Sequence, residues 1–177
     1  MLASDMFAAS GTMSVTLSVG EGTLTVTAGS TGATVSNSGT STVTVTGTVT
    51  QINNLLAGNL SGTLTYTINS DTPPSSDTLT LTANDQGNTG TGGTLTGADT
   101  ATINITAVND APVNAVPGAQ TMNEDASLTF NSGNSNLISV SDIDNASLTA
   151  YTIAVSHGTL TLAQTTGLTF NTGDGTA

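Results

Sequence analysis

The amino-acid sequence predicts an all-β protein built as a tandem array of antiparallel β-sandwiches. Apolar and polar residues alternate with a period of two over most of the chain, as they do in half-buried strands. Thr makes up about one residue in five, and β-branched side chains suit the pleated surface of a sheet. The 20 glycines supply frequent turns, and long patterns of helical period are absent.

The predicted strands are short alternating runs that are separated by clusters of Gly, Asn, Ser and Asp. Several short strands at such spacing are typical of a sandwich. The runs occupy residues 13–19, 22–27, 41–49, 62–68, 76–83, 99–108, 126–130, 147–155, 158–163 and 167–170.

Residues 50–60, TQINNLLAGNL, are the one candidate for a helix. Ile52, Leu55 and Leu56 have the spacing to face a core for one or two turns, and Gly58 closes the segment. We expect a short crossover between two strands.

An internal repeat lies within the chain. Residues 4–26 resemble residues 141–162 at an offset of about 136 residues, with Ser-Asp and Gly-Thr-Leu-Thr aligned. Residues 1–110 are therefore predicted to be one repeat that lacks its first strand, and residues 111–177 to be the opening part of the next. MLASDMFAAS carries an Asp and no basic residue, so it makes a poor signal peptide, and we expect a window of a longer array.

The incomplete repeats allow a second interpretation, in which neighbouring chains complete each other's sandwiches by strand addition. Against it, residues 138–177 duplicate the role of residues 1–40 and do not supply only what is missing. Both interpretations stay open at this point.

The charged side chains of this protein are all acidic. It has 12 Asp and Glu, no Lys or Arg, one His and a formal net charge of −12. Binding to nucleic acid or to an anionic membrane surface needs basic side chains, so both partners are excluded. No apolar run is long enough for insertion into a membrane. A hard divalent cation such as calcium is the natural counter-charge for carboxylates that have no basic partner.

The usual signatures of catalysis are absent, and we predict that the protein is not an enzyme. There is no Cys, no Gly-x-Ser-x-Gly elbow and no P-loop, and the Ser and Thr hydroxyls have no base to activate them. His157 lies between two predicted strands and is expected to be a turn residue. Carboxylate pairs occur on predicted linkers, but 3% aromatic residues offer almost nothing for stacking on a sugar.

Four acidic motifs follow one another along the chain at the ends of predicted strands. They are ANDQG at 83–87, VNDAP at 108–112, NEDASLTF at 123–130 and SDIDN at 141–145. Asp at positions i and i+2 of an irregular turn can point both carboxylates at one ion. Calcium accepts about six to eight oxygen ligands, at about 2.3–2.6 Å.

These motifs and their order resemble cadherin-like repeats, and more closely the cadherin-like and immunoglobulin-like repeats of large bacterial surface adhesins, including the RTX-type extender repeats. The resemblance covers nearly the whole chain. It implies that the Asn-Asp-x-Pro linker binds calcium at the junction of two repeats and that Pro112 ends the strand. The first repeat departs from the pattern, because Phe7 stands where the second has Asp144 and Asp5 therefore lacks a partner at i+2.

The residues expected to bind Ca²⁺ follow from the charge and from this resemblance. Asp125 either binds the ion or flanks a ligand, and Asp71, Asp77 and Asp174 are expected to be turn residues. The expected ligands are Asp110, Glu124, Asp142 and Asp144 at the junction, Asn109 through its carbonyl, Asp85 on the loop after a strand, and Asp99 before the last strand of the repeat.

The function that the resemblance implies is structural. We expect a calcium-stiffened extender segment of an extracellular, cell-surface adhesin or filament that mediates cell adhesion and biofilm attachment, with neighbouring repeats of the same protein as partners. The alternative is a subunit of a self-assembling extracellular fibre, in which identical chains are joined by strand exchange. A third possibility, a ligand-binding module, needs an exposed aromatic residue or a pocket, and the sequence indicates neither.

Overall fold

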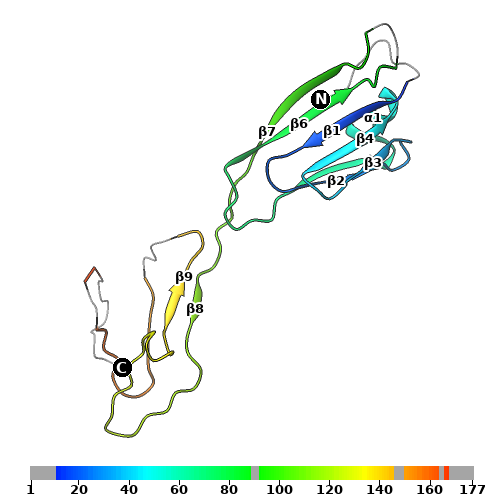
Figure 1. The fold of residues 1–177 in the computed structure, drawn as a ribbon. Coiled ribbons are helices and arrows are strands. Elements are labelled where there is room, and N and C mark those ends of the chain that lie inside the picture. The colour runs from blue at the N-terminus through cyan, green and yellow to red at the C-terminus, as the bar shows by residue number, and fades with distance from the viewer. Residues whose placement is uncertain (1–10, 89–91, 146–149, 164–165, 168–177) are drawn as a thin grey trace. The chain divides into compact units, whose positions relative to one another are not determined.

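The structure is a computed structural model that describes residues 11–88, 92–145, 150–163 and 166–167 (Figure 1). These residues form mostly antiparallel β-strands with little helix, which confirms the all-β prediction. Contacts divide the chain into two compact units, Met1–Asp110 and Ala111–Ala177. That these units are successive repeats of one sandwich stays a prediction.

The first unit contains a five-stranded antiparallel sheet with the order β3-β4-β1-β6-β7. β1 lies at its centre, where Val15 pairs with Val45 on one side and with Ala83 on the other. The strands are β1 Met13–Ser18, β3 Thr34–Ser36, β4 Thr42–Gly47, β6 Ser76–Asn84 and β7 Thr96–Asn104.

A two-stranded antiparallel sheet completes the first unit. β2 (Thr23–Thr27) pairs with β5 (Thr63–Thr67), so that Val26 is opposite Leu64 and Leu24 is opposite Tyr66. All the strands predicted for this unit form, with ends that shift by a few residues. Only β3, which is three residues long, was not predicted, because so short a run carries little alternation.

Both sheets contribute apolar side chains to one hydrophobic core. Alternation along β1 and β4 places Val, Leu and Met on one face, and this face is buried. Complete burial of one such side chain stabilises the fold by about 1.5–3 kcal/mol. The buried apolar residues are Met13, Val15, Leu17, Val19, Leu24, Val26, Ala33, Val43, Val45, Ile52 and Leu55.

The helix α1 (Val49–Leu56) connects β4 to β5 and confirms the predicted crossover. Thr48 begins it with a capping box: its side chain accepts from the backbone N–H of Gln51, whose own side chain accepts from the N–H of Thr48. Ile52 and Leu55 are buried in the core. Gly58 adopts a left-handed conformation that ends the helical path, and a 3₁₀ turn, η1 (Asn59–Ser61), follows.

The second unit has far less regular structure than the sequence predicts. Its described strands are β8 (Val113–Ala115) and β9 (Ser139–Ser141), which pair antiparallel. The strands predicted at 126–130 and 158–163 are wrong, and so is the described part of the strand at 147–155. Residues 147–149 and 168–170 lie outside the described part of the chain.

The missing strands of the second unit have a physical reason. A strand is stable only when a neighbouring backbone pairs with it and one of its faces is covered. None of the described apolar side chains of this unit is buried, and Val113, Met122 and Ile143 are more than half exposed. Alternation marks a strand-forming sequence, but here the described residues supply no second layer against which its apolar face could pack.

Candidate metal-binding site

Asp142 and Asp144 lie in one closed turn directly after β9. The Asp142 Oδ1 accepts from the backbone N–H of Asp144 at 3.0 Å and of Asn145 at 3.1 Å. These bonds form an Asx-type turn, in which a carboxylate replaces a backbone acceptor. Asp142 is half-buried and Asp144 is exposed. The predicted Asp-x-Asp motif is therefore an ordered turn that carries two carboxylates two residues apart.

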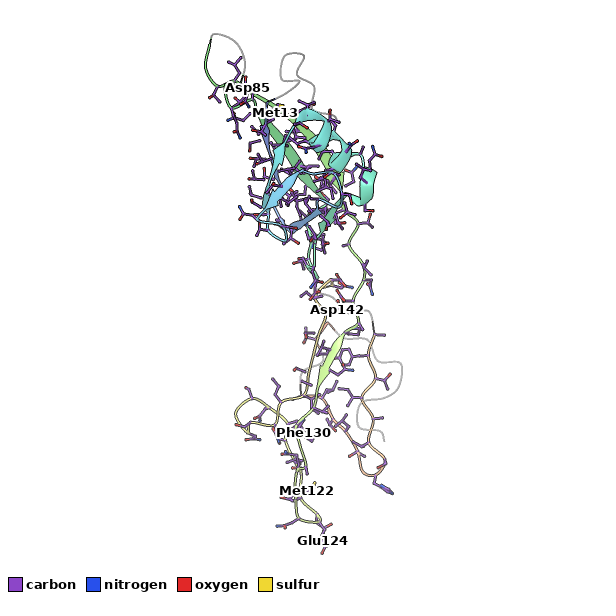
Figure 2. The ribbon with its side chains drawn as sticks, turned by 90° about the vertical axis from the view of Figure 1, so that its right-hand side faces the viewer. Met13, Asp85, Met122, Glu124, Phe130 and Asp142 are labelled. Atoms are coloured by element: carbon purple, nitrogen blue, oxygen red, sulfur yellow. The ribbon has the colours of Figure 1, made fainter. Side chains whose placement is uncertain are left out.

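Glu124 and Asp125 form a second acidic turn in the same unit. Both side chains are exposed, and Asp125 has a left-handed backbone with φ of 61°. Figure 2 shows Glu124 and Asp142 at opposite ends of this unit. The structure therefore does not bring Glu124 to the turn of Asp142 and Asp144.

Asn109 and Asp110 end the first unit. The Asn109 side-chain amide donates to the backbone carbonyl of Asp110 at 3.0 Å, so the two residues form a local bond within the linker motif. Asn109 is exposed and Asp110 is half-buried. β7 ends at Asn104, and Asn109, Asp110 and Pro112 all lie in irregular backbone before β8 begins at Val113.

Asp85 closes the loop between β6 and β7 (Figure 2). Its Oδ1 accepts from the N–H of Gly87 at 2.9 Å and of Leu95 at 2.8 Å, and its own N–H donates to the Leu95 carbonyl at 3.1 Å. The bonds from Gly87 and Leu95 lower the pKa of the Asp85 carboxyl, because they favour its charged form. The contacts give Asp85 a loop-closing role, and its role as a metal ligand stays a prediction.

Asp99 lies within β7, and its Oδ1 accepts from the N–H of Thr100 at 2.8 Å. β7 holds nine residues, and its two ends are therefore about 26 Å apart. Asp85 precedes one end of this strand, and Asp110 follows the other. The candidates of the first unit are thus spread along the strand and do not converge on one point.

The sequence interpretation missed the structural role of the Asp77 carboxylate, which accepts hydrogen bonds from residues far apart in the chain. Asp77 was expected to be a turn residue, but it is the second residue of β6 and is half-buried. Its Oδ1 accepts from the N–H of Gly20 at 3.0 Å and of Thr78 at 2.6 Å. Its Oδ2 accepts from the N–H of Glu21 and from the Tyr66 hydroxyl, both at 3.1 Å.

These donors change the acidity of both side chains. The backbone bond from Glu21 lowers the pKa of Asp77 most, with further contributions from Thr78, Gly20 and Tyr66. Burial, followed by the bond to Asp77, raises the pKa of Tyr66. No local motif signals this cluster, because Gly20 and Glu21 are 57 and 56 residues from Asp77 in the sequence. Asp77 thus fastens the β1–β2 turn to β6 and carries no sign of a metal role.

The oxygen donors of the candidate residues fit calcium, which prefers carboxylate, amide and backbone oxygens. Within the described ranges, however, no three His, Asp or Glu side chains gather closely enough to hold a metal ion. Asp142 and Asp144 are two predicted carboxylate ligands that share one hydrogen-bonded turn. The predicted ligands thus have the residue types that calcium requires, but the structure does not bring them together within either unit.

No protein-family model, curated protein or solved structure matches the chain. The resemblance to adhesin repeats and the function that it implies therefore stay predictions. In the described part of the chain, no helix has the length and apolar character that crossing a bilayer requires.

Proposed function

We propose that the chain is a calcium-stiffened extender segment of an extracellular adhesin or surface filament, made of tandem cadherin-like or immunoglobulin-like β-sandwiches. One observation carries the proposal. A chain with 12 carboxyl side chains and no Lys or Arg forms antiparallel sheets, and its Asp-x-Asp motif is an ordered turn at the end of a strand. Such a chain has carboxylates to offer to a cation and no basic side chain to neutralise them.

The first unit supports the sandwich architecture. Its five-stranded and two-stranded sheets supply side chains to one core, since Val15 and Val45 come from the larger sheet and Leu24 and Val26 from the smaller. Two sheets around one apolar layer are the essence of a sandwich.

Calcium would occupy the Asp-x-Asp turn in this proposal. Asp142 and Asp144 supply two carboxylates, and backbone carbonyls and water supply further oxygens toward the six to eight or so that the ion accepts. We assign Asp110 and Asn109 to the same ion on the strength of the sequence motifs, and we do not assign Glu124 to it, because Glu124 lies at the opposite end of the unit from Asp142. Assembly of this set requires the ion, because the carboxylates repel one another without it.

The mechanism is stiffening of the chain by bound ions. An ion that binds both sides of a linker replaces free rotation with a fixed joint, and a stiff array holds a terminal binding domain away from the cell. Neighbouring repeats of the same protein are then the direct partners, and the cell surface is the place of action. Adhesion to surfaces and biofilm attachment follow from this arrangement.

Thermal unfolding of the full chain tests the proposal. Calcium is added stepwise and then removed with EDTA, with magnesium at the same concentration as the ionic control. At a calcium concentration about 100 times the Kd, we expect about 2.7 kcal/mol of added stability and a calcium-specific rise in Tm. Small-angle scattering should show a more extended chain with calcium than in EDTA.

A matched pair of variants locates the ion. Asp142→Asn with Asp144→Asn should reduce the calcium-dependent rise in Tm. Glu21→Gln with Asp71→Asn removes the same charge from two exposed residues outside the motifs and should leave that rise unchanged. Equal calcium responses in both double variants, or no calcium response in the unaltered chain, would overturn the proposal.

A further inference from the structure

The two sheets of the first unit differ in width. Neighbouring strands lie about 4.8 Å apart, so the axes of five strands span about 19 Å, whereas those of two span about 5 Å. β2 and α1 contact β4, and the apolar side chains of β4 and β1 are buried. Leu79 and Leu81 of β6 are only half-buried, and Ala101 of β7 is exposed. The β6–β7 part of the large sheet is therefore incompletely covered.

An apolar slot of about 160 Å³ lies at this place. The side chains that line the slot are all aliphatic. It is lined by Leu17 of β1, Leu56 of α1, Leu64 of β5, Leu79 and Leu81 of β6, and Ala101 of β7. A cavity of similar size, about 150 Å³, lined by apolar side chains accommodates a benzene molecule, so the slot has room for the ring of a Phe side chain.

The strand that borders the slot, β5, is an edge strand of the small sheet within the described part of the chain. Among the described residues, β5 pairs with β2 on one side and with no strand on the other. Unpaired edge N–H and C=O groups are a template for an additional strand. A strand added there would lie over β6 and β7 and direct alternate side chains into the slot.

The chain contains a segment with the required pattern. Ala126, Leu128 and Phe130 alternate with polar residues in ASLTF, so in an extended conformation they share one face. The segment forms no strand in its own unit, and Phe130 is 37% exposed.

We propose that the slot beside β5 is an acceptor for residues 126–130 of a second copy of this chain, with Phe130 as the side chain that fills it. Each copy then carries one acceptor and one donor, and the contact is head-to-tail. Such a contact builds an open filament unless the rotation between copies closes a ring. The proposal does not depend on calcium.

Sedimentation velocity of the full chain in EDTA and physiological salt tests the proposal over a wide range of protein concentration. Salt is needed because copies with a net charge of −12 repel one another at low ionic strength. We expect association that rises with concentration. A synthetic peptide of residues 121–133 in excess should dissociate the assemblies, and a peptide with Phe130→Ala should bind about 30-fold more weakly.

Two pairs of variants of the full chain check both sides of the contact. Ala101→Glu places a charge in the slot, and Thr102→Glu places the same charge on the opposite face of β7. Phe130→Ala removes the filling side chain, and Thr129→Ala alters the opposite face of the donor. Only Ala101→Glu and Phe130→Ala should weaken association. Association that does not weaken with Ala101→Glu or with Phe130→Ala would overturn the proposal. A chain that stays monomeric at every concentration would also overturn it, whether or not the peptide binds.

Discussion

The Tyr66 hydroxyl donates to the Asp77 Oδ2 at 3.1 Å and thereby joins β5 of the small sheet to β6 of the large sheet. The same carboxylate accepts from the backbone N–H groups of Gly20 and Glu21, which form the turn between β1 and β2. One side chain therefore links both sheets and the first connection between them. A bond to a charged acceptor contributes more than a bond between neutral groups.

Replacement of Asp77 by Asn should lower the Tm at pH 7 by about 5 °C. The pKa of Asp77 is lowered in the folded protein, so its ionised form stabilises the fold above the ordinary carboxyl pKa of about 3.9. This contribution is lost as the pH falls through the depressed folded pKa. The Tm values of the variant and the unaltered chain should therefore converge below about pH 4, which calorimetry across the acid range will measure.

Two further variants separate the effect of the cluster from the effect of charge. Tyr66→Phe removes one of the four donors to Asp77 and should lower the Tm by less than Asp77→Asn does. Asp71→Asn removes the same charge from an exposed residue of the preceding loop and should have little effect. A Tm loss for Asp71→Asn as large as that for Asp77→Asn would refute the role of the cluster.

Asp85→Ala should destabilise the β6–β7 loop whether or not calcium is present. The change removes the acceptor of the N–H groups of Gly87 and Leu95. The amide of Leu95 should then exchange with solvent faster, as measured by hydrogen exchange in EDTA. Because the pKa of Asp85 is lowered, the loss of Tm should be full at neutral pH and should shrink below about pH 4.

Asp99→Ala is the matched control for Asp85, since it removes an equal charge from a carboxylate that accepts from the N–H of the next residue, Thr100. It should leave the exchange of Leu95 unchanged. If Asp85 is also a calcium ligand, its variant will lose more Tm with calcium than in EDTA. An equal loss in both conditions leaves Asp85 with the loop-closing role alone.

The sequence predicted the first unit well because its signals there are local and mutually consistent. The alternation in residues 13–19 and 41–49 becomes the buried faces of β1 and β4, and Gly58 ends α1 as its position indicates. In the second unit the same alternation in residues 126–130 gives no strand, because pairing depends on a partner backbone that the pattern does not specify.

The candidate site was predictable as a set of residue types but not as an arrangement. The Asp142-x-Asp144 spacing by itself indicates a turn, and the turn forms. Other features depend on contacts between residues far apart in the chain. They are the separation of Glu124 from this turn and the hydrogen bonds that join Asp77 to the β1–β2 turn. Patterns in a single sequence carry no information about such contacts. An acidic motif therefore predicts a carboxylate that can bind a partner, but it does not specify which partner.

Gly29→Ala should destabilise the first unit far more than Gly39→Ala. Both residues have positive φ, 56° and 87°, so an added Cβ strains the backbone of each by about 1–2 kcal/mol. At Gly29 a Cβ would also lie 2.4 Å from backbone atoms of Ser61, whereas at Gly39 it would meet nothing within 4 Å. Chemical denaturation of both variants measures the difference, and equal losses would contradict the contact with Ser61.

Backbone amides of β1 should exchange with solvent much more slowly than those of β8 and β9. β1 is paired on both sides and has Val15 and Leu17 fully buried. The β8–β9 ladder consists of three residue pairs, and all of β8 is exposed. Amides in such a ladder open at low free-energy cost, whereas those in a core strand require global unfolding of their unit. Hydrogen exchange read by NMR measures both sets in one experiment.

A core variant tests whether this difference reflects two separate cooperative units. Leu55 is fully buried, so Leu55→Ala should cost the first unit about 2–5 kcal/mol, whereas Leu60→Ala, at an exposed position, should cost under about 0.5 kcal/mol. Exchange in β1 should then accelerate in the Leu55 variant by the corresponding factor, at least about 30-fold. Exchange in β8 and β9 should not change, because the contacts of Leu55 lie within the first unit. Equal acceleration in both units would show that the chain unfolds as one cooperative body.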